Sequence, residues 1–136
     1  MYLLPKPRKW KTTEGIFTIC YNRAIVVDNS CPPEVLCESL GFTLRITRGS
    51  ACPGDISLRL DEALEAQAYE LHINADGIII TGGSACGLFY GMQTLRQMTQ
   101  QEGCCLPYTS IQDRPQIEHR GFYHDVTRGR IPTMDY

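Results

Sequence analysis

Apolar and polar residues alternate with a period of two in several segments of the chain. The alternation runs through 15–21 and 24–27, then through "TLRITR" and "ISLRLD", and is clearest in "YELHINADGIIITGG". There Tyr69, Leu71 and Ile73 alternate with polar residues, and Asn, Asp and Gly at 74–77 separate them from 78–81. This pattern predicts half-buried strands, the last two of which form a hairpin.

Two other segments have the spacing of helices. In 30–41, Ser30 can cap the first turn, two prolines suit that turn, and Gly41 ends the segment. From Ser84 to Gly103, apolar residues recur every three or four positions, which predicts a long amphipathic helix. The residues of this stripe are Ala85, Leu88, Phe89, Met92, Leu95 and Met98.

The order of these elements predicts the fold class. Prolines at 5 and 7 favour an extended edge strand at the start, and residues 62–68 suit a soluble connector. The segment "CCLPYTSIQDRPQ" is expected to be a loop with a short strand. Strands joined mostly by hairpins, with two helices, indicate an α+β domain over 1–116. Its two helices would pack on one face of a largely antiparallel sheet.

Charge and composition exclude several classes of partner. A net charge of −2 offers no basic field for nucleic acid. Uninterrupted apolar runs such as 78–80 are far shorter than the roughly 20 residues that span a bilayer. Seven cysteines without a Cys-x-x-Cys pair argue against disulfides and zinc, so most are expected to be reduced and buried. With no signal peptide in the sequence, free cysteines favour a cytoplasmic location.

Motifs for cofactors or metals fail on the residues that would do the chemistry. "TGGSACG" at 81–87 has the position of a phosphate loop, but Leu88 and Phe89 stand where Lys and Ser or Thr are needed. A tight turn before a closely packed helix is the preferred interpretation. The acidic residues at 61, 62, 65 and 70 suit a solvated surface. His119 and His124 would face opposite sides of a strand, so neither a metal nor a cofactor is expected.

The last twenty residues, "IEHRGFYHDVTRGRIPTMDY", concentrate polar side chains. If 122–126 is a strand, burial of Asp125 requires a cation, and Arg120 or Arg128 is its natural partner. A guanidinium held in this way can still offer N–H groups to sugar hydroxyls. A structural ion pair at a domain seam explains the same residues.

Two stretches together resemble glycoside hydrolase family 20, the β-N-acetylhexosaminidases. They are "YELHINADGIIITGGSACGLFYGMQTLRQM" and "IQDRPQIEHRGFYHDVTRGRIPT". The matching positions are Tyr69, Leu71, Ile73, Asp76, Gly77, Gly87, Phe89, Tyr90, Gly91, Gln93, Thr94, Leu95, Asp113, Pro115, Arg120, Gly121, Asp125, Val126, Arg128 and Pro132. The resemblance implies that 1–116 is an accessory domain and that 117–136 begins the catalytic TIM barrel, which is incomplete in this chain.

The resemblance also implies roles for residues in the last segment. Arg120 takes the position that binds hydroxyls of an N-acetylhexosamine, while Asp125 and Arg128 shape the site. The family hydrolyses its substrate with help from the substrate's own acetamido group, which an Asp-Glu pair orients. That pair corresponds to no part of this chain, so the chain contains no catalytic residue and is expected to be inactive alone.

The expected partners follow from the same resemblance. They are N-acetylhexosamine-containing glycans, bound through the rest of the barrel, and the chain's own catalytic domain. Exposed strand edges also favour self-association. Two alternatives stay open: a stand-alone carbohydrate- or protein-binding module, and an accessory domain of an α-glucuronidase or O-GlcNAc hydrolase.

Overall fold

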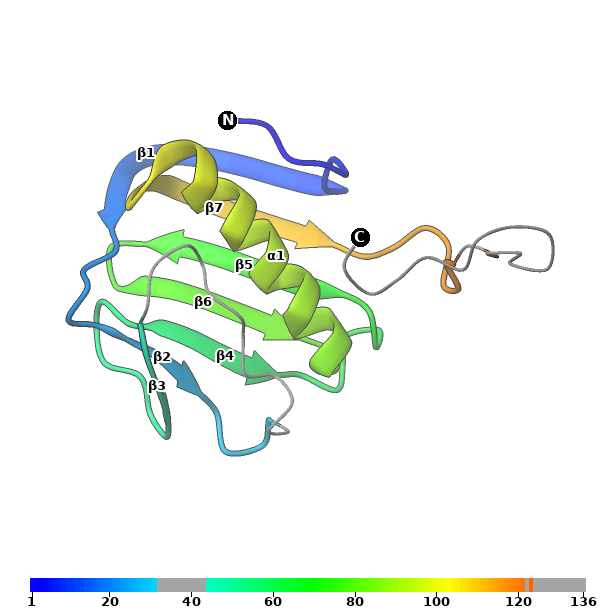
Figure 1. The fold of residues 1–136 in the computed structure, drawn as a ribbon, viewed down its shortest axis with the longest axis horizontal. Coiled ribbons are helices and arrows are strands. Elements are labelled where there is room, and N and C mark those ends of the chain that lie inside the picture. The colour runs from blue at the N-terminus through cyan, green and yellow to red at the C-terminus, as the bar shows by residue number, and fades with distance from the viewer. Residues whose placement is uncertain (32–43, 122, 124–136) are drawn as a thin grey trace, which may run out of the picture.

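A computed structural model describes residues 1–31, 44–121 and 123. Within these residues, a seven-stranded sheet carries a long helix across one face (Figure 1). The helix is α1 (Ala85–Glu102). The strands are β1 (Lys9–Thr18), β2 (Ala24–Val27), β3 (Arg45–Arg48), β4 (Ile56–Leu60), β5 (Tyr69–Asn74), β6 (Gly77–Gly82) and β7 (Cys105–Asp113).

The sheet is mixed, and the prediction of a largely antiparallel sheet is wrong. Its order is β1-β7-β5-β6-β4-β2-β3, with antiparallel pairs from β1 to β6 and parallel pairs from β6 to β3. The connector after β4 and the strand β5 together carry the chain back, so β6 runs in the same direction as β4. Alternation within a strand does not reveal this crossover. The helix predicted over 30–41 falls mostly outside the described residues.

Strand β7 also differs from its prediction as a loop with a short strand. It pairs with β1 between 105 and 112 and with β5 over 109–113, with Ile111 opposite Trp10 and Leu71. Pro107 lies opposite Ile16, beside the register shift in β1. An irregular pairing tolerates a residue that has no N–H to donate, which explains how a strand contains this proline.

The hairpin and the long helix are confirmed, and the core lies between them. The register of β5 and β6 places Asn74 opposite Gly77 around a two-residue turn. Ser84 caps α1 by accepting a hydrogen bond from the Cys86 amide at 3.1 Å. Phe89 is 55% exposed, because it lies one position beyond the buried Leu88 and so points away from the sheet. The large side chains that are fully buried are Val27, Ile56, Leu58, Leu71, Ile78, Ile80, Leu88, Leu95, Met98, Leu106 and Ile111.

Glycines allow α1 to approach the sheet closely. A Cβ atom on Gly87 would lie 2.2 Å from the carbonyl oxygen of Ala68, and one on Gly91 would lie 2.5 Å from Cγ2 of Ile80. Both distances are shorter than real carbon contacts. The segment 81–87 is therefore a tight strand-to-helix turn, as the missing phosphate-binding residues predict.

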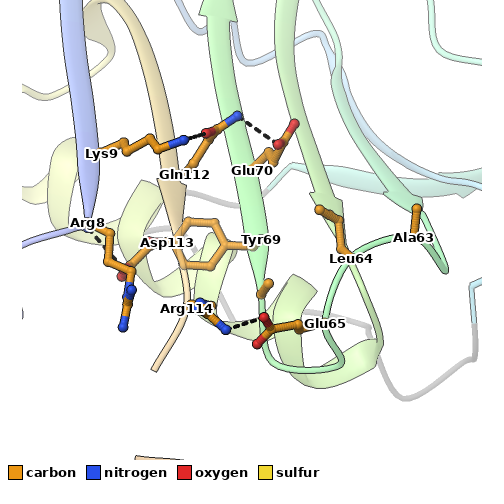
Figure 2. A pocket seen from close by; sticks show the side chains of 11 residues that line it. Arg8, Lys9, Ala63, Leu64, Glu65, Tyr69, Glu70, Gln112, Asp113 and Arg114 are labelled. Atoms are coloured by element: carbon orange, nitrogen blue, oxygen red, sulfur yellow. Dashed lines mark hydrogen bonds and ion pairs between the residues drawn. The ribbon is translucent and has the colours of Figure 1, made fainter. Parts of the chain in front are cut away.

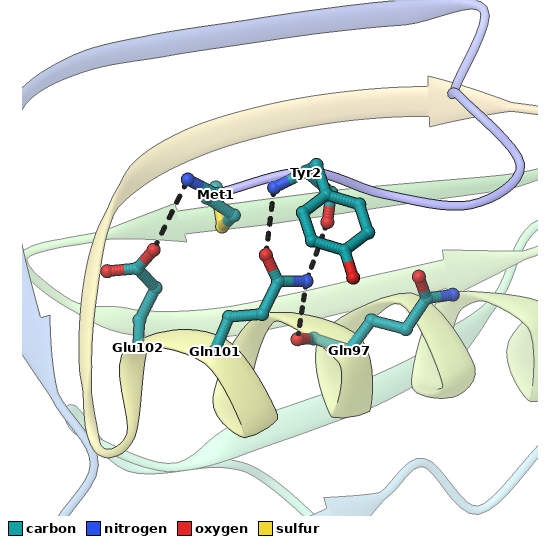
Figure 3. Close-up of polar contacts among 5 residues, drawn as sticks. All are labelled: Met1, Tyr2, Gln97, Gln101 and Glu102. Atoms are coloured by element: carbon teal, nitrogen blue, oxygen red, sulfur yellow. Dashed lines mark hydrogen bonds and ion pairs between the residues drawn. The ribbon is translucent and has the colours of Figure 1, made fainter.

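The N-terminal residues 1–4 form an extended strap along α1 (Figure 3). Gln101 accepts a hydrogen bond from the Tyr2 amide at 2.8 Å and donates one to the Tyr2 carbonyl at 2.6 Å. Gln97 makes the same pair of bonds with Leu4, at 3.0 and 2.9 Å. Between them, Leu3 is buried in the core. The strap thus adds an apolar side chain to the core and satisfies its backbone through two side-chain amides.

The prediction that most cysteines are buried is wrong. Among the cysteines that the structure describes, Cys31 is buried, while Cys20, Cys52, Cys86, Cys104 and Cys105 are exposed, and all are free thiols. Several of the exposed ones lie at element ends, where the chain turns away from the core. Hydrophobic character alone does not bury a residue at such positions.

Candidate functional site

The chain leaves the sheet at the end of β7, beside the 61–68 connector and the N-terminal turns of α1. We call residues 114–121 the exit segment. Its side chains and carbonyls contact both the connector and the helix, through residues that are far apart in sequence. This junction gathers the polar residues of the last described part of the chain.

The first contact of the exit segment is an ion pair between Arg114 and Glu65. The Arg114 hydrogen bond holds the pKa of the Glu65 carboxyl below its usual range, and the same bond raises the pKa of Arg114. Both side chains are exposed, so water and salt screen the pair strongly. The ion pair therefore holds the start of the exit segment against the connector, and it adds little to the free energy of unfolding.

Arg120 makes the second set of contacts. Its Nη2 donates to the Tyr90 hydroxyl at 2.6 Å and to Oε1 of Gln67 at 3.0 Å, and its Nη1 donates to the Ile117 carbonyl. Its guanidinium carbon lies 5.5 Å from the centre of the Tyr90 ring, within range of a cation–π interaction. Gln67 also donates from Nε2 to the Glu118 carbonyl at 3.0 Å. The arginine is thus held by a connector residue and a helix residue together.

Tyr90 links this junction to the surface of α1. A hydrogen bond with the Cys86 thiol, one turn earlier, is the main cause that raises the pKa of the Tyr90 hydroxyl. The neighbouring Phe89 packs edge-on, with ring centroids 5.9 Å apart at an angle of 62°. Because the phenol stays protonated at neutral pH, its oxygen is a neutral acceptor for Arg120.

An open groove of about 550 Å³ lies beside the junction, where β1, β5 and β7 meet the connector (Figure 2). Its carboxylates are already engaged: Glu70 accepts from Nε2 of Gln112 at 2.8 Å and lies 3.5 Å from Nε2 of His72. This arrangement fits the predicted solvated surface and contains no pair of free carboxyls poised for glycoside hydrolysis. The lining residues are Arg8, Lys9, Ala63, Leu64, Glu65, Ala68, Tyr69, Glu70, Gln112, Asp113 and Arg114.

The structure describes one of the three predicted site residues. Arg120 is exposed and bonded within the junction, whereas Asp125 and Arg128 lie outside the described residues. Sequence reasoning missed Gln67 and Tyr90 as partners of Arg120. Tyr90 belongs to the stretch that resembles family 20 and could have been found there. Gln67 carries no such signal, because it lies in a polar connector.

Metal sites and membrane-spanning helices are two further possibilities to weigh for the described part of the chain. There, no group of three or more His, Cys, Asp and Glu side chains could hold a metal ion. Across the same residues, no helix is both long enough and apolar enough to cross a membrane.

Tyr69, at the base of the groove, should make stability depend on alkaline pH. Burial raises the pKa of Tyr69 to about 12, from an ordinary value of 10.0. Because the folded pKa is the higher one, this stabilisation is complete below pH 10 and is lost as pH rises toward 12. We expect roughly 2–3 kcal/mol of the free energy of unfolding to disappear in that window.

Urea unfolding at a series of pH values checks this expectation, with tyrosinate absorbance reporting ionisation. Tyr69→Phe is the matched variant: it loses the 2.6 Å hydrogen bond to Thr94, yet its stability should fall less steeply above pH 10. Equal slopes for the two proteins would contradict the assignment.

A family model described as "Glycosyl hydrolase family 20, domain 2" matches residues 1–114. The chain is 30% identical to a beta-hexosaminidase of Vibrio vulnificus over 130 residues, which cover 93% of this chain and 15% of that protein. It is 31% identical to a beta-N-acetylhexosaminidase of Cellulomonas fimi, covering 93% of this chain and 28% of the relative. The chain therefore spans only a small part of the length of these relatives.

Solved structures show the same fold within larger proteins. The exo-β-N-acetylglucosaminidase of Vibrio harveyi, solved with N-acetylglucosamine, aligns with a TM-score of 0.71 and 26% identity, over 87% of this chain and 20% of that one. The chitobiase of Flavobacterium johnsoniae aligns with a TM-score of 0.74 over 96% of this chain and 23% of that chain. At 20% identity, the second likeness concerns the fold alone.

Proposed function

The chain belongs to glycosyl hydrolase family 20 as its domain 2, and from this premise we propose that it serves a β-N-acetylhexosaminidase-like hydrolase as the non-catalytic domain. The observation that carries the proposal is the match over residues 1–114, which ends at the first residue of the exit segment. The whole enzyme would remove terminal N-acetylhexosamine from glycans by substrate-assisted hydrolysis. A family 20 match favours this function over an α-glucuronidase accessory domain or a stand-alone binding module.

The proposed partner of the domain is its own catalytic barrel. The domain boundary would fall after residue 116, and 117–136 would supply the first barrel strand. One strand cannot close an eight-stranded barrel, so the chain needs the remaining strands to build a sugar site. In that site Arg120 would contact the sugar, with Asp125 and Arg128 shaping its surroundings, and the Asp-Glu pair would come from a later strand.

Chromogenic N-acetylglucosaminides and N-acetylgalactosaminides test the proposal. We expect the 136-residue chain to give no turnover, and the full gene product to hydrolyse at least one of the two substrates. Turnover that co-purifies with the 136-residue chain and survives Arg120→Ala would contradict the non-catalytic role. A full gene product that folds but hydrolyses neither substrate would contradict the assigned activity.

A further inference from the structure

We propose that Gln67 and Tyr90 are positioning residues that hold the guanidinium of Arg120 and thereby set where the exit segment leaves the domain. We call Gln67, Tyr90 and Arg120 the clasp. The connector supplies Gln67, α1 supplies Tyr90, and the exit segment supplies Arg120. The connector and the start of α1 pack closely, but within the described residues no strand pairing joins the exit segment to either of them, so side chains make this part of the junction.

The geometry of the clasp constrains both position and orientation. Nη2 of Arg120 donates two hydrogen bonds, to acceptors in residues that lie 53 and 30 positions away in the sequence. The Ile117 carbonyl binds the other terminal nitrogen, and Gln67 also binds the Glu118 carbonyl. A planar guanidinium fixed at both terminal nitrogens has little freedom to rotate. The clasp therefore orients the backbone from 117 to 120 as well as the arginine.

The acceptors in the clasp are all neutral. A phenol, a carboxamide and a backbone carbonyl bind Arg120, and within the described residues it has no ion pair. Neutral acceptors fix the direction of a guanidinium without cancelling its charge, whereas a carboxylate would do both. A contact that only held the chain in place could use a carboxylate equally well. The arrangement suits an arginine whose remaining N–H groups and positive charge act elsewhere.

The purpose of the clasp rests on the proposed function, although its existence does not. In an enzyme whose barrel begins just after residue 116, a contact made by residues 67 and 90 would fix the start of the first barrel strand. Gln67 and Tyr90 would then influence sugar binding through Arg120, without themselves touching the sugar.

Trypsin provides a direct test, because it must draw an arginine side chain into its own pocket before cleaving the next peptide bond. In the 136-residue chain, cleavage between Arg120 and Gly121 competes with the clasp. We expect Tyr90→Phe and Gln67→Ala each to raise the initial rate of this cleavage about three- to tenfold, the range for the loss of one ordinary hydrogen bond, because the clasp is exposed to solvent. Mass spectrometry early in the digestion identifies the bond that is cut.

Matched variants separate the clasp from general loosening of the fold. Tyr2→Phe removes a phenol whose hydroxyl makes no hydrogen bond in the described part of the chain, and Gln100→Ala removes an exposed amide from α1. Both should be cleaved at the wild-type rate. Gln67→Glu keeps an acceptor facing Arg120 and adds an opposite charge, but it loses the donor to the Glu118 carbonyl, so it should be cleaved more slowly than Gln67→Ala.

Wild-type cleavage rates in both Tyr90→Phe and Gln67→Ala would overturn the proposal, as would equal acceleration in the two controls. Acceleration in Gln67→Glu as large as in Gln67→Ala would also overturn it, because the acceptor would then be irrelevant. None of these readings depends on glycosidase activity. An inactive full gene product would therefore refute the proposed function while leaving the clasp intact.

Discussion

Replacing Gly87 with alanine is expected to destabilise the fold by about 3 kcal/mol, within the range for forced overpacking. In most helices the same change stabilises by up to about 1 kcal/mol, because alanine is the better helix former. Here the new methyl group would lie 2.2 Å from the carbonyl oxygen of Ala68, and the obstacle is backbone that cannot rotate away. Either α1 or the end of the connector must shift. Urea unfolding measures the loss.

Gly121→Ala is the control for this prediction. Among the described residues, a Cβ atom at Gly121 meets nothing within 4 Å, so the variant should unfold with nearly wild-type free energy. If Gly87→Ala proves as stable as wild type, the close approach of α1 to Ala68 is not required by the fold.

Truncating Leu95 to alanine is expected to cost about 3 kcal/mol, near the middle of the range for buried leucines. Leu95 is 0% exposed and belongs to the layer between α1 and the sheet. Its neighbours come from a rigid sheet on one side and a helix on the other, so the resulting cavity should collapse only in part. Thermal and urea unfolding should both show the loss.

Gln100→Ala serves as the control on the same helix, because Gln100 is exposed. This variant should change the free energy of unfolding by less than about 0.5 kcal/mol. A Leu95→Ala protein that matches it in stability would mean that α1 contributes little to the core.

The sequence predicted local elements well where one periodicity dominated. The β5–β6 hairpin and α1 both follow from spacing and from Asn74, Gly77, Ser84 and Gly103 at their ends. Strand β7 was hidden by Pro107, which local rules count against a strand and which the irregular pairing with β1 accommodates. Strand direction was equally hidden, because it depends on where a whole hairpin packs and not on the residues within it.

The candidate site shows the same limit more sharply. Arg120 stood out because it matches a family motif, but its partners lie 30 and 53 positions away. A glutamine in a polar connector looks like any solvated residue until the fold brings it to an arginine. Neither periodicity nor composition carries information about such a long-range pair of hydrogen bonds.

The N-terminal strap has a consequence for how related sequences should vary. In the strap, Gln97 and Gln101 bind the main chain of residues 2 and 4 and not their side chains, through groups that every residue except proline possesses. Drift at Tyr2 and Leu4 should therefore be nearly free, while Leu3 and the two glutamines should change together or not at all. The helix binds the backbone of the strap, much as a neighbouring strand would, and places little constraint on the side chains at positions 2 and 4.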